Sequence, residues 1–173
     1  MFHSNTELLI DYWRSQRTGR LMPARRDIDP AGFVPLAPRV FVAARDHPDI
    51  RFRLAGEEVI ALLGRPAAAG SVLALWRAEH RGRVAALLGA SLIAGEPMVI
   101  EAAAGDGPRL RLEMLFAPLT APDGVADRFL GLCQPLSGLA CGPLADLTVA
   151  AVNGLASERG HLRLAAVSGR RIA

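Results

Sequence analysis

The sequence predicts an α+β fold in which a five-stranded antiparallel sheet is covered by short helices. Five segments have strand-like patterns bounded by turn residues: 39–45, 50–56, 97–104, 109–119 and 128–136. The block between the second and the third of them, 57–95, is rich in Ala and Leu and loses the period of two. Because short turns separate the last three strands, we expect them to pair as an antiparallel meander, with the helical block as a cover.

The first predicted element is an amphipathic helix over about residues 6–17. Ser4 and Glu7 have the spacing of a capping box, and Gly19 supplies a stop. The apolar stripe of this helix consists of Leu8, Leu9, Tyr12 and Trp13. The stripe either packs on the sheet of its own chain or forms a dimer interface, because aromatic side chains are enriched at interfaces. The sequence leaves both readings open.

The segment 23–38 links this helix to the first strand and contains four prolines. We expect it to be ordered, with Asp29 initiating a turn or short helix that begins at Pro30. Asp27 and Asp29 stand beside two arginines. Catalytic carboxylates need environments that separate their pKa values, so we interpret this group as a structural ion-pair and capping cluster.

The sheet is predicted to have one buried and one solvent-exposed face. Over 109–116, charged side chains alternate with apolar ones. The charged ones are Arg109, Arg111 and Glu113. The same logic places Phe52 and Leu54 on the buried face. Helices within 57–94 would cover that face, the longest of them near 79–94.

Turn signals and domain boundaries complete the predicted organisation. Turns are expected at 46–49, 105–107 and 122–124. The chain divides into an N-terminal helix and Pro-rich linker, a core and a C-terminal extension, at 1–38, 39–137 and 138–173. The extension holds an apolar stretch of helix length at 144–155 and a strand-like stretch at 161–167.

Composition excludes several classes of protein. Hydrophobic residues make up 51% of the 173, which excludes a disordered chain, and no apolar run approaches the roughly 18 residues of a spanning helix. We expect no membrane partner, and the N-terminus lacks a secretory signal pattern, which favours the cytoplasm. All 20 basic residues are scattered arginines and the net charge is +3, so we expect no nucleic-acid partner.

The residues that carry chemistry in other proteins show no constellation here. The four histidines and the two cysteines, Cys133 and Cys141, lack the spacing of metal ligands. Gly-x-Ser-x-Gly, His-Glu-x-x-His and complete dinucleotide patterns do not occur. We therefore predict no enzyme, no metal and no cofactor.

Three blocks of residues spread over 8–136 form a pattern by their order and spacing. The first is Asp11-Tyr12-Trp13, Gly19 and Pro23-x-Arg25-x-Asp27-Ile28-Asp29-Pro30. The second is Phe52-Arg53-Leu54-Ala55-Gly56, Leu63-Gly64-Arg65, Gly70 and Leu75-Trp76. The third is Leu112-Glu113-Met114-Leu115, Pro118-Leu119 and Asp127-Arg128-Phe129-Leu130-Gly131. With His161-Leu162-Arg163, they resemble the stand-alone PAS proteins common in alphaproteobacteria; Glu57 departs from that pattern, which more often has a small hydroxyl residue there.

This resemblance implies a PAS-like fold and a sensory or regulatory role in bacterial signalling, such as motility, cell-cycle or stress control. Proteins similar to this one dimerise, dock other proteins or hold a small molecule between sheet and helices. The resemblance thus implies a homodimer, for which the N-terminal helix is our candidate interface, and an unidentified signalling protein as partner.

A ligand, if one binds, should lie between the inner face of the sheet and the helices, in an apolar pocket. The candidate lining residues are Trp76, Met98, Met114 and Phe116. Each also fits an ordinary core position. A filled core favours a protein-docking module, and an open one favours a sensor of an apolar ligand or cofactor. A small α+β enzyme is the third hypothesis and ranks last, because it needs an inward-facing His or carboxylate.

Overall fold

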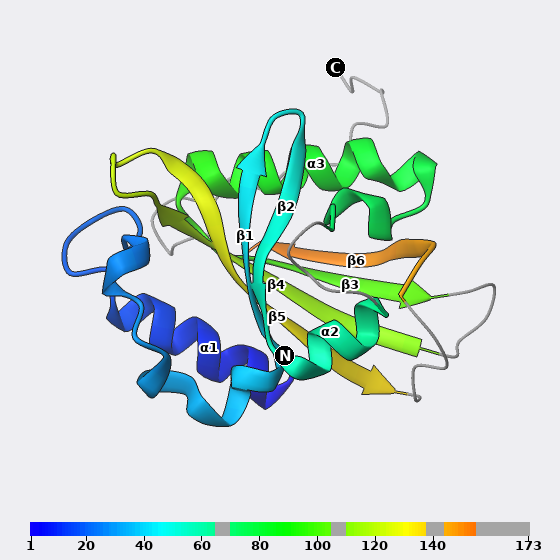
Figure 1. Cartoon of the computed structure of the whole chain (residues 1–173), viewed down its shortest axis with the longest axis horizontal. Helices are drawn as coiled ribbons and strands as arrows, with labels where there is room; N and C mark the ends of the chain where they lie inside the picture. The colour runs from blue at the N-terminus through cyan, green and yellow to red at the C-terminus, as the bar shows by residue number, and fades with distance from the viewer. Residues whose placement is uncertain (65–69, 105–109, 138–143, 155–173) are drawn as a thin grey trace, which may run out of the picture.

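The computed structural model describes residues 1–64, 70–104, 110–137 and 144–154, and these form a six-stranded sheet with helices on both faces (Figure 1). The strand order is β2-β1-β5-β4-β3-β6, and all neighbours are antiparallel. The strands are β1 Val40–Asp46, β2 Asp49–Ala55, β3 Met98–Ala104, β4 Leu110–Thr120, β5 Ala126–Ser137 and β6 Leu147–Gly154. The α+β class is confirmed, and the sheet has one strand more than predicted.

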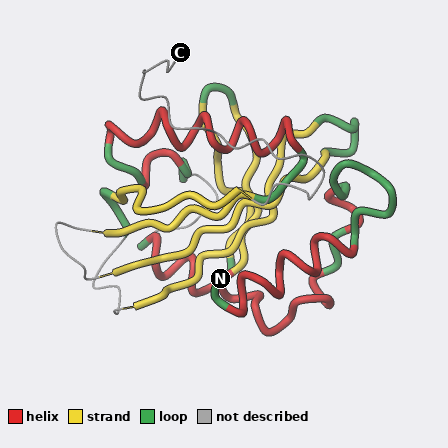
Figure 2. The backbone as a smooth tube through the Cα atoms, turned by 180° about the vertical axis from the view of Figure 1, so that it is seen from behind, coloured by secondary structure: helices red, strands yellow, loops and turns green. Residues whose placement is uncertain are grey.

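Helices and short 3-10 segments enclose the sheet, as the tube view shows (Figure 2). The helices are α1 Ser4–Ser15, α2 Glu57–Leu63 and α3 Ala78–Ala94, and the 3-10 segments are η1 Arg25–Asp27, η2 Pro30–Arg39 and η4 Leu73–Leu75. α2, η4 and α3 pack on one face, which we call the inner face, and α1 packs with η2 on the outer face. Asp29 caps η2 as predicted, since its Oδ1 accepts a hydrogen bond from the Ala31 amide at 2.9 Å.

The outer face of the sheet is buried where α1 and η2 cover it, which corrects the prediction that this whole face is exposed to solvent; Arg111 of β4, on the same face, is exposed as predicted. On β4, Leu112, Met114 and Phe116 belong to the inner core, while Leu115, Ala117 and Leu119 belong to the outer core. The alternation read from the sequence was real, but the residues of the N-terminal helix and linker cover the second face. Strands buried on both faces read as continuous apolar runs, as β4 does from position 114 onward.

Two details of the strands depart from the expected pattern. Leu54 was expected to face inward with Phe52, yet it is 58% exposed. The register of β1 and β2 shifts between Val42 and Ala43, so that Val42 faces Leu54 and Ala43 faces Phe52. This β-bulge inserts one extra residue and turns Leu54 to the outer side of the sheet.

The apolar stretch at 144–155 was predicted as a helix, and this prediction is wrong for the residues described there. Residues 147–154 form β6, which pairs with β3 along its whole length. β3 would otherwise be an edge strand with unpaired backbone groups, and pairing with β6 satisfies them. Thr148, Val149 and Val152 are β-branched and suit a strand. The strand-like stretch at 161–167 and the turn at 105–107 lie outside the described residues.

α1 begins at Ser4 and ends at Ser15, with His3 rather than Ser4 as its N-cap. The ring Nδ1 of His3 accepts a hydrogen bond from the Asn5 amide at 3.1 Å. Glu7 instead accepts from the amide of Phe2 at 3.3 Å. The capping interaction is therefore made one residue earlier than the Ser-x-x-Glu spacing suggested.

Candidate functional site

The four residues predicted to line a ligand pocket come together in the inner core. Met98 of β3 lies opposite Phe116 of β4, and Met114 lies two residues before Phe116 on the same strand. Trp76 follows η4. Trp76, Met114 and Phe116 are fully buried, and Met98 is half-buried against the same core. Sequence reasoning thus identified one spatial cluster.

Aromatic rings occupy the space between the inner face and the helices. Phe52, Phe41, Phe116 and Phe129 form a series of edge-to-face contacts with centroid distances of 5.2, 5.5 and 5.8 Å. All four rings are buried. The ring of Phe41 lies directly over Gly131 of β5, where an added Cβ would overlap it. Mutual contact and burial of this kind are typical of densely packed protein interiors.

Trp76 carries an unusual feature for a core residue. Its Nε1–H is buried, and none of the described residues accepts a hydrogen bond from it. The other tryptophan, Trp13, is equally buried, but its Nε1 donates to the carbonyl oxygen of Pro118 at 2.9 Å. A buried donor without a partner costs free energy, so a position such as that of Trp76 is where a bound acceptor would be stabilised.

Two hollows on the surface of the described residues lie away from this aromatic core. The larger, of about 620 Å³, lies between the loop that precedes η1, the end of α3 and the turn between β4 and β5. The smaller, of about 220 Å³, lies beside η2 and the β1–β2 pair, with Leu54 on its wall. Sequence reasoning missed both hollows.

The predicted dimer-interface stripe of α1 divides between the core and the surface. Leu9 and Trp13 are fully buried in the outer core. Tyr12 is half-buried; its hydroxyl accepts from the Asp29 amide at 2.8 Å and donates to the Asp29 carbonyl at 2.9 Å. Leu8 is 47% exposed. A second chain that docks on α1 would therefore meet Leu8, while Leu9 and Trp13 hold the helix on its own sheet.

Two buried polar side chains of the sheet hold the start of α1. Glu113 is buried, and both carboxylate oxygens lie 3.1 Å from the His3 amide, which donates to them. Glu113 faces Gln134 across β4 and β5, and Gln134 Oε1 accepts from Asn5 Nδ2 at 2.9 Å and from Arg39 at 3.3 Å. This corrects the expectation that Glu113 faces solvent. The carboxylate also lies at the positive end of the α1 dipole.

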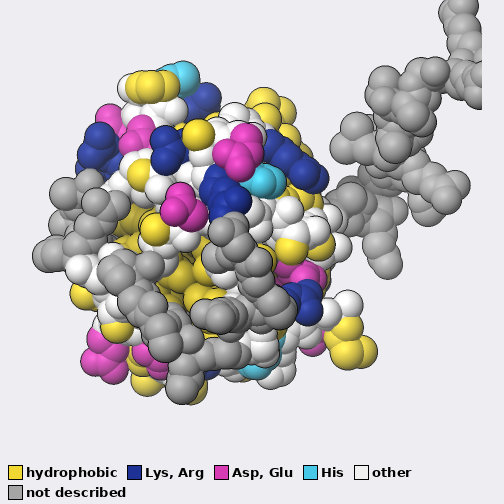
Figure 3. Space-filling model, turned by 90° about the vertical axis from the view of Figure 1, so that its right-hand side faces the viewer, with side chains coloured by type: hydrophobic (Ala, Val, Ile, Leu, Met, Phe, Trp, Pro, Cys, Tyr) yellow, Lys and Arg dark blue, Asp and Glu magenta, His cyan; other side chains and the backbone are white. Residues whose placement is uncertain are grey.

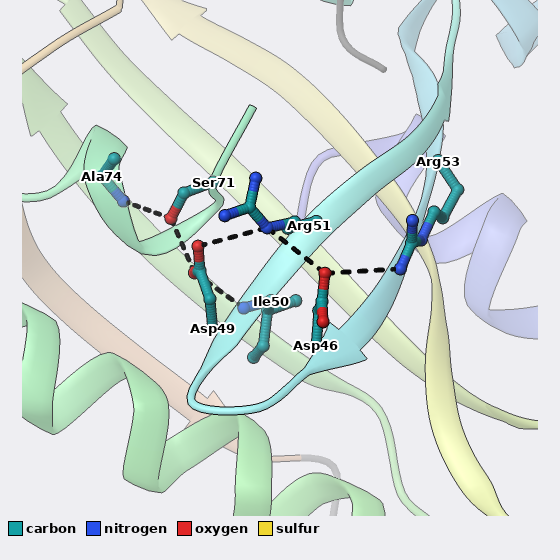
Figure 4. Close-up of polar contacts among 7 residues, drawn as sticks. All are labelled: Asp46, Asp49, Ile50, Arg51, Arg53, Ser71 and Ala74. Atoms are coloured by element: carbon teal, nitrogen blue, oxygen red, sulfur yellow. Dashed lines mark hydrogen bonds and ion pairs between the residues drawn. The ribbon is translucent and has the colours of Figure 1, made fainter. Parts of the chain in front are cut away.

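Polar contacts link the turn between β1 and β2 to the segment before η4, as Figure 4 shows. Asp49 Oδ1 accepts from the hydroxyl of Ser71 at 2.6 Å and from the Ile50 amide at 2.7 Å. Arg51 lies 3.3 Å from Asp46 and 3.9 Å from Asp49. The amide of Val72 donates a hydrogen bond to the carbonyl of Ile50. The segment before η4 therefore lies along the edge of β2 that does not pair with β1. We interpret the group as structural.

Two further titratable residues, Asp27 and Cys133, also have structural surroundings. Asp27 accepts from the Ala24 amide at 3.0 Å and lies 3.3 Å from Arg20, which agrees with a capping cluster. Burial raises the pKa of the Cys133 thiol to about 12, so this thiol stays protonated. Within the described ranges, no group of three or more His, Cys, Asp or Glu residues is arranged to hold a metal ion.

The surface shown in Figure 3 carries acidic and basic side chains interspersed, with hydrophobic side chains gathered near its centre.

No helix in the described parts of the chain is both long and apolar enough to cross a membrane.

Comparisons with known proteins agree with the fold. No curated protein matches the chain. A family model described as a PAS domain matches residues 1–134, which include α1, the linker and the strands through most of β5. The chain therefore belongs to the PAS domain family, whose members serve as sensory modules in signalling.

Proposed function

We propose that this chain is a non-enzymatic regulatory module of bacterial signalling that acts through protein docking and dimerisation in the cytoplasm. Its output would be a change in protein contacts, in a pathway such as motility, cell-cycle or stress control. Family membership supports a sensory role in general, and the choice of docking over ligand binding rests on the packing of the inner core.

The observation that carries the proposal is the filled inner core. Phe41, Phe52, Phe116 and Phe129 contact one another edge to face where a ligand would lie, and Trp76 and Met114 are fully buried beside them. A ligand of ordinary size needs a cavity of roughly 300–1,000 Å³. Admitting one here would require these side chains to move, whereas docking of a protein requires only the outer surface.

Three of the four buried polar side chains among the described residues support a role without catalysis. Ser91 donates to the carbonyl of Glu96 at 2.6 Å, and Glu113 accepts from the His3 amide. Gln134 bonds Asn5 and Arg39. Each of these groups is occupied by a contact that holds one element against another. A general acid or base must instead reach a substrate proton.

Three of the exposed apolar residues, each on a different helix or strand, are chosen as positions at which to seek a partner. Leu8 lies on α1, Leu54 on β2 and Ile93 near the end of α3. p-Benzoylphenylalanine placed at each position, in cells that normally make the protein, should yield photo-crosslinked protein at one or more of them. A homodimer through α1 predicts that position 8 captures a second copy of the chain. Absence of any crosslink at all three positions would contradict docking.

A second function, sensing of an apolar ligand, is favoured by one observation. The buried Nε1–H of Trp76 has no acceptor among the described residues. A small molecule with a carbonyl or ether oxygen would satisfy this donor if the neighbouring rings adjusted. Native mass spectrometry separates this function from docking, because only ligand sensing predicts a small molecule that is released on denaturation.

A further inference from the structure

We propose that the larger hollow is a docking groove for an acidic, amphipathic segment of a partner protein. We call it the arginine groove. The side chains that carry the argument are Arg20, Leu21, Arg25, Arg26, Leu92 and Ile93. The proposal rests on the docking function proposed above and adds both the place and the chemistry of the partner.

The arginine groove presents apolar side chains to solvent. Ile93 is 84% exposed and Leu21 is 55% exposed, and both line the hollow. Val125, on the turn between β4 and β5, is 56% exposed and stands between two residues of the wall. Single exposed apolar residues are ordinary, but a group around a hollow indicates a surface that is covered by a partner.

The lining of the groove is also positively charged. Arg20, Arg25 and Arg26 all line it. Asp27 lies 3.3 Å from Arg20 and 3.8 Å from Arg26, and it also accepts from the backbone amide of Ala24. One carboxylate is thus shared by two guanidiniums, and among the described residues no carboxylate forms an ion pair with Arg25. Positive charge remains on the lining, and it complements carboxylates on a partner.

The walls of the groove are held together by contacts within the chain. The amide of Thr120 donates to the carbonyl of Pro23 at 3.0 Å, which ties the loop to the end of β4. The side chain of Leu21 lies against Gly95, which ends α3 in the left-handed region at φ +67°. Figure 1 shows the loop, the β4–β5 turn and this end of α3 meeting on one side of the molecule. The groove therefore exists before a partner binds, which reduces the ordering cost of binding.

The exposure of the walls favours a protein segment over a small molecule. A small-molecule pocket buries most of its ligand, whereas Ile93 and Leu21 leave much of their surface open. Interfaces combine apolar anchors with arginine, as this groove does. A segment with apolar side chains on one face and Asp or Glu beside them would cover Ile93 and pair with Arg25 and Arg26. Helices of this kind dock into grooves through anchors three or four residues apart.

Photo-crosslinking at position 93, in cells that normally make the protein, tests the proposal. The captured segment, mapped by mass spectrometry, should combine apolar with acidic residues. Replacing both arginines with Arg25→Glu and Arg26→Glu should lower the capture about tenfold or more, because attraction becomes repulsion. Arg83→Glu changes an exposed arginine of α3 outside the groove and serves as the control, with capture unchanged. Thermal melts would show that all variants fold.

Each other outcome contradicts the proposal in a distinct way. Capture of a second copy of this chain, of lipid, of nucleic acid or of a basic segment at position 93 would overturn the assigned partner. Capture that survives Arg25→Glu with Arg26→Glu would overturn the role of charge. Capture at position 8 or 54 with none at 93 would overturn the arginine groove and leave the docking function standing. Loss of capture at all three positions would overturn both.

Discussion

The carboxylate of Glu113, in the middle of the sheet, accepts a hydrogen bond from the backbone amide of His3 at 3.1 Å. The contact joins β4 to the residue that caps α1. It explains why an acidic side chain is tolerated on a buried strand face, since the negative charge meets the amide end of a helix. Docking of α1 therefore depends on a residue 110 positions further along the chain.

Replacing Glu113 should loosen α1 from the sheet. Glu113→Ala removes a buried acceptor and leaves the His3 amide without its partner, so we expect the free energy of unfolding to fall by about 1–3 kcal/mol. Urea denaturation monitored by circular dichroism measures this. Glu79→Ala, at an exposed position in the first turn of α3, is the control and should change stability by less than about 1 kcal/mol. Equal effects of both variants would contradict the anchoring role.

The close approach of Phe41 to Gly131 predicts a second stability effect. A Cβ at position 131 would overlap the ring of Phe41, so Gly131→Ala should cost about 1–3 kcal/mol through displaced packing. Phe41→Leu in the same chain should recover part of this cost, which a double-mutant cycle by urea denaturation detects. Gly89→Ala is the control, because nothing lies within 4 Å of an added Cβ there. We expect it to raise stability by up to about 1 kcal/mol, as α3 gains a better helix former.

The two buried tryptophans should respond differently to the same substitution. Trp13→Phe removes the hydrogen bond to Pro118, whereas Trp76→Phe removes an Nε1–H that has no acceptor among the described residues. Because both side chains are fully buried, the packing losses are similar. We expect Trp13→Phe to cost about 1 kcal/mol more than Trp76→Phe in chemical denaturation. The reverse order would indicate that Trp76 has a bound partner.

The thiol of Cys133 should be inert in the folded protein. Burial raises its pKa to about 12 from 9.0, so the folded state keeps the proton over a range in which the unfolded chain loses it. The contribution of the protonated thiol to the free energy of unfolding is complete below pH 9. It is lost as the pH rises from 9 toward 12, because the unfolded chain then releases a proton that the folded chain keeps. In a Cys141→Ser background, a thiol reagent at pH 8 should react with Cys133 only after unfolding. Rapid reaction with the native protein would contradict its burial.

The sequence was sufficient for the parts of the fold that follow local rules. Pro, Asp and Gly mark the turns at 46–49 and 122–124 in the sequence. These turns, and the strands that they join, were therefore predicted to within a few residues. The cluster of Trp76, Met98, Met114 and Phe116 followed from the alternation of the strands and from the helical block expected to cover their apolar face. The helix over 79–94 was predicted to within one residue at its start.

Long-range contacts explain the predictions that were wrong. Glu113 reads as exposed by alternation, and only the arrival of α1 on the outer face buries it. Leu54 reads as inward, and only the bulge opposite Val42 turns it outward. The residues of β6 read as a helix by length, and the free edge of β3 recruits them as a strand. None of these partners lies near in sequence.

The arginine groove was missed because its walls come from three separate segments. Arg25 and Arg26 are adjacent in the sequence of the linker, but only the fold brings residues such as Ile93 of α3 to the same groove. One signal was present in the sequence. Leu92 of α3 is buried, and Ile93 is the next residue. Because successive residues of a helix point in different directions, Ile93 is expected to lie off the buried face.

Native mass spectrometry of the purified chain, followed by denaturation and analysis of any released molecule, tests most directly whether the inner core is filled by the chain's own side chains. We expect a mass equal to that of the chain or of two chains, with nothing released on denaturation. A molecule released in a fixed ratio to the chain, and lost from Trp76→Phe, would contradict the filled core and make ligand sensing the function.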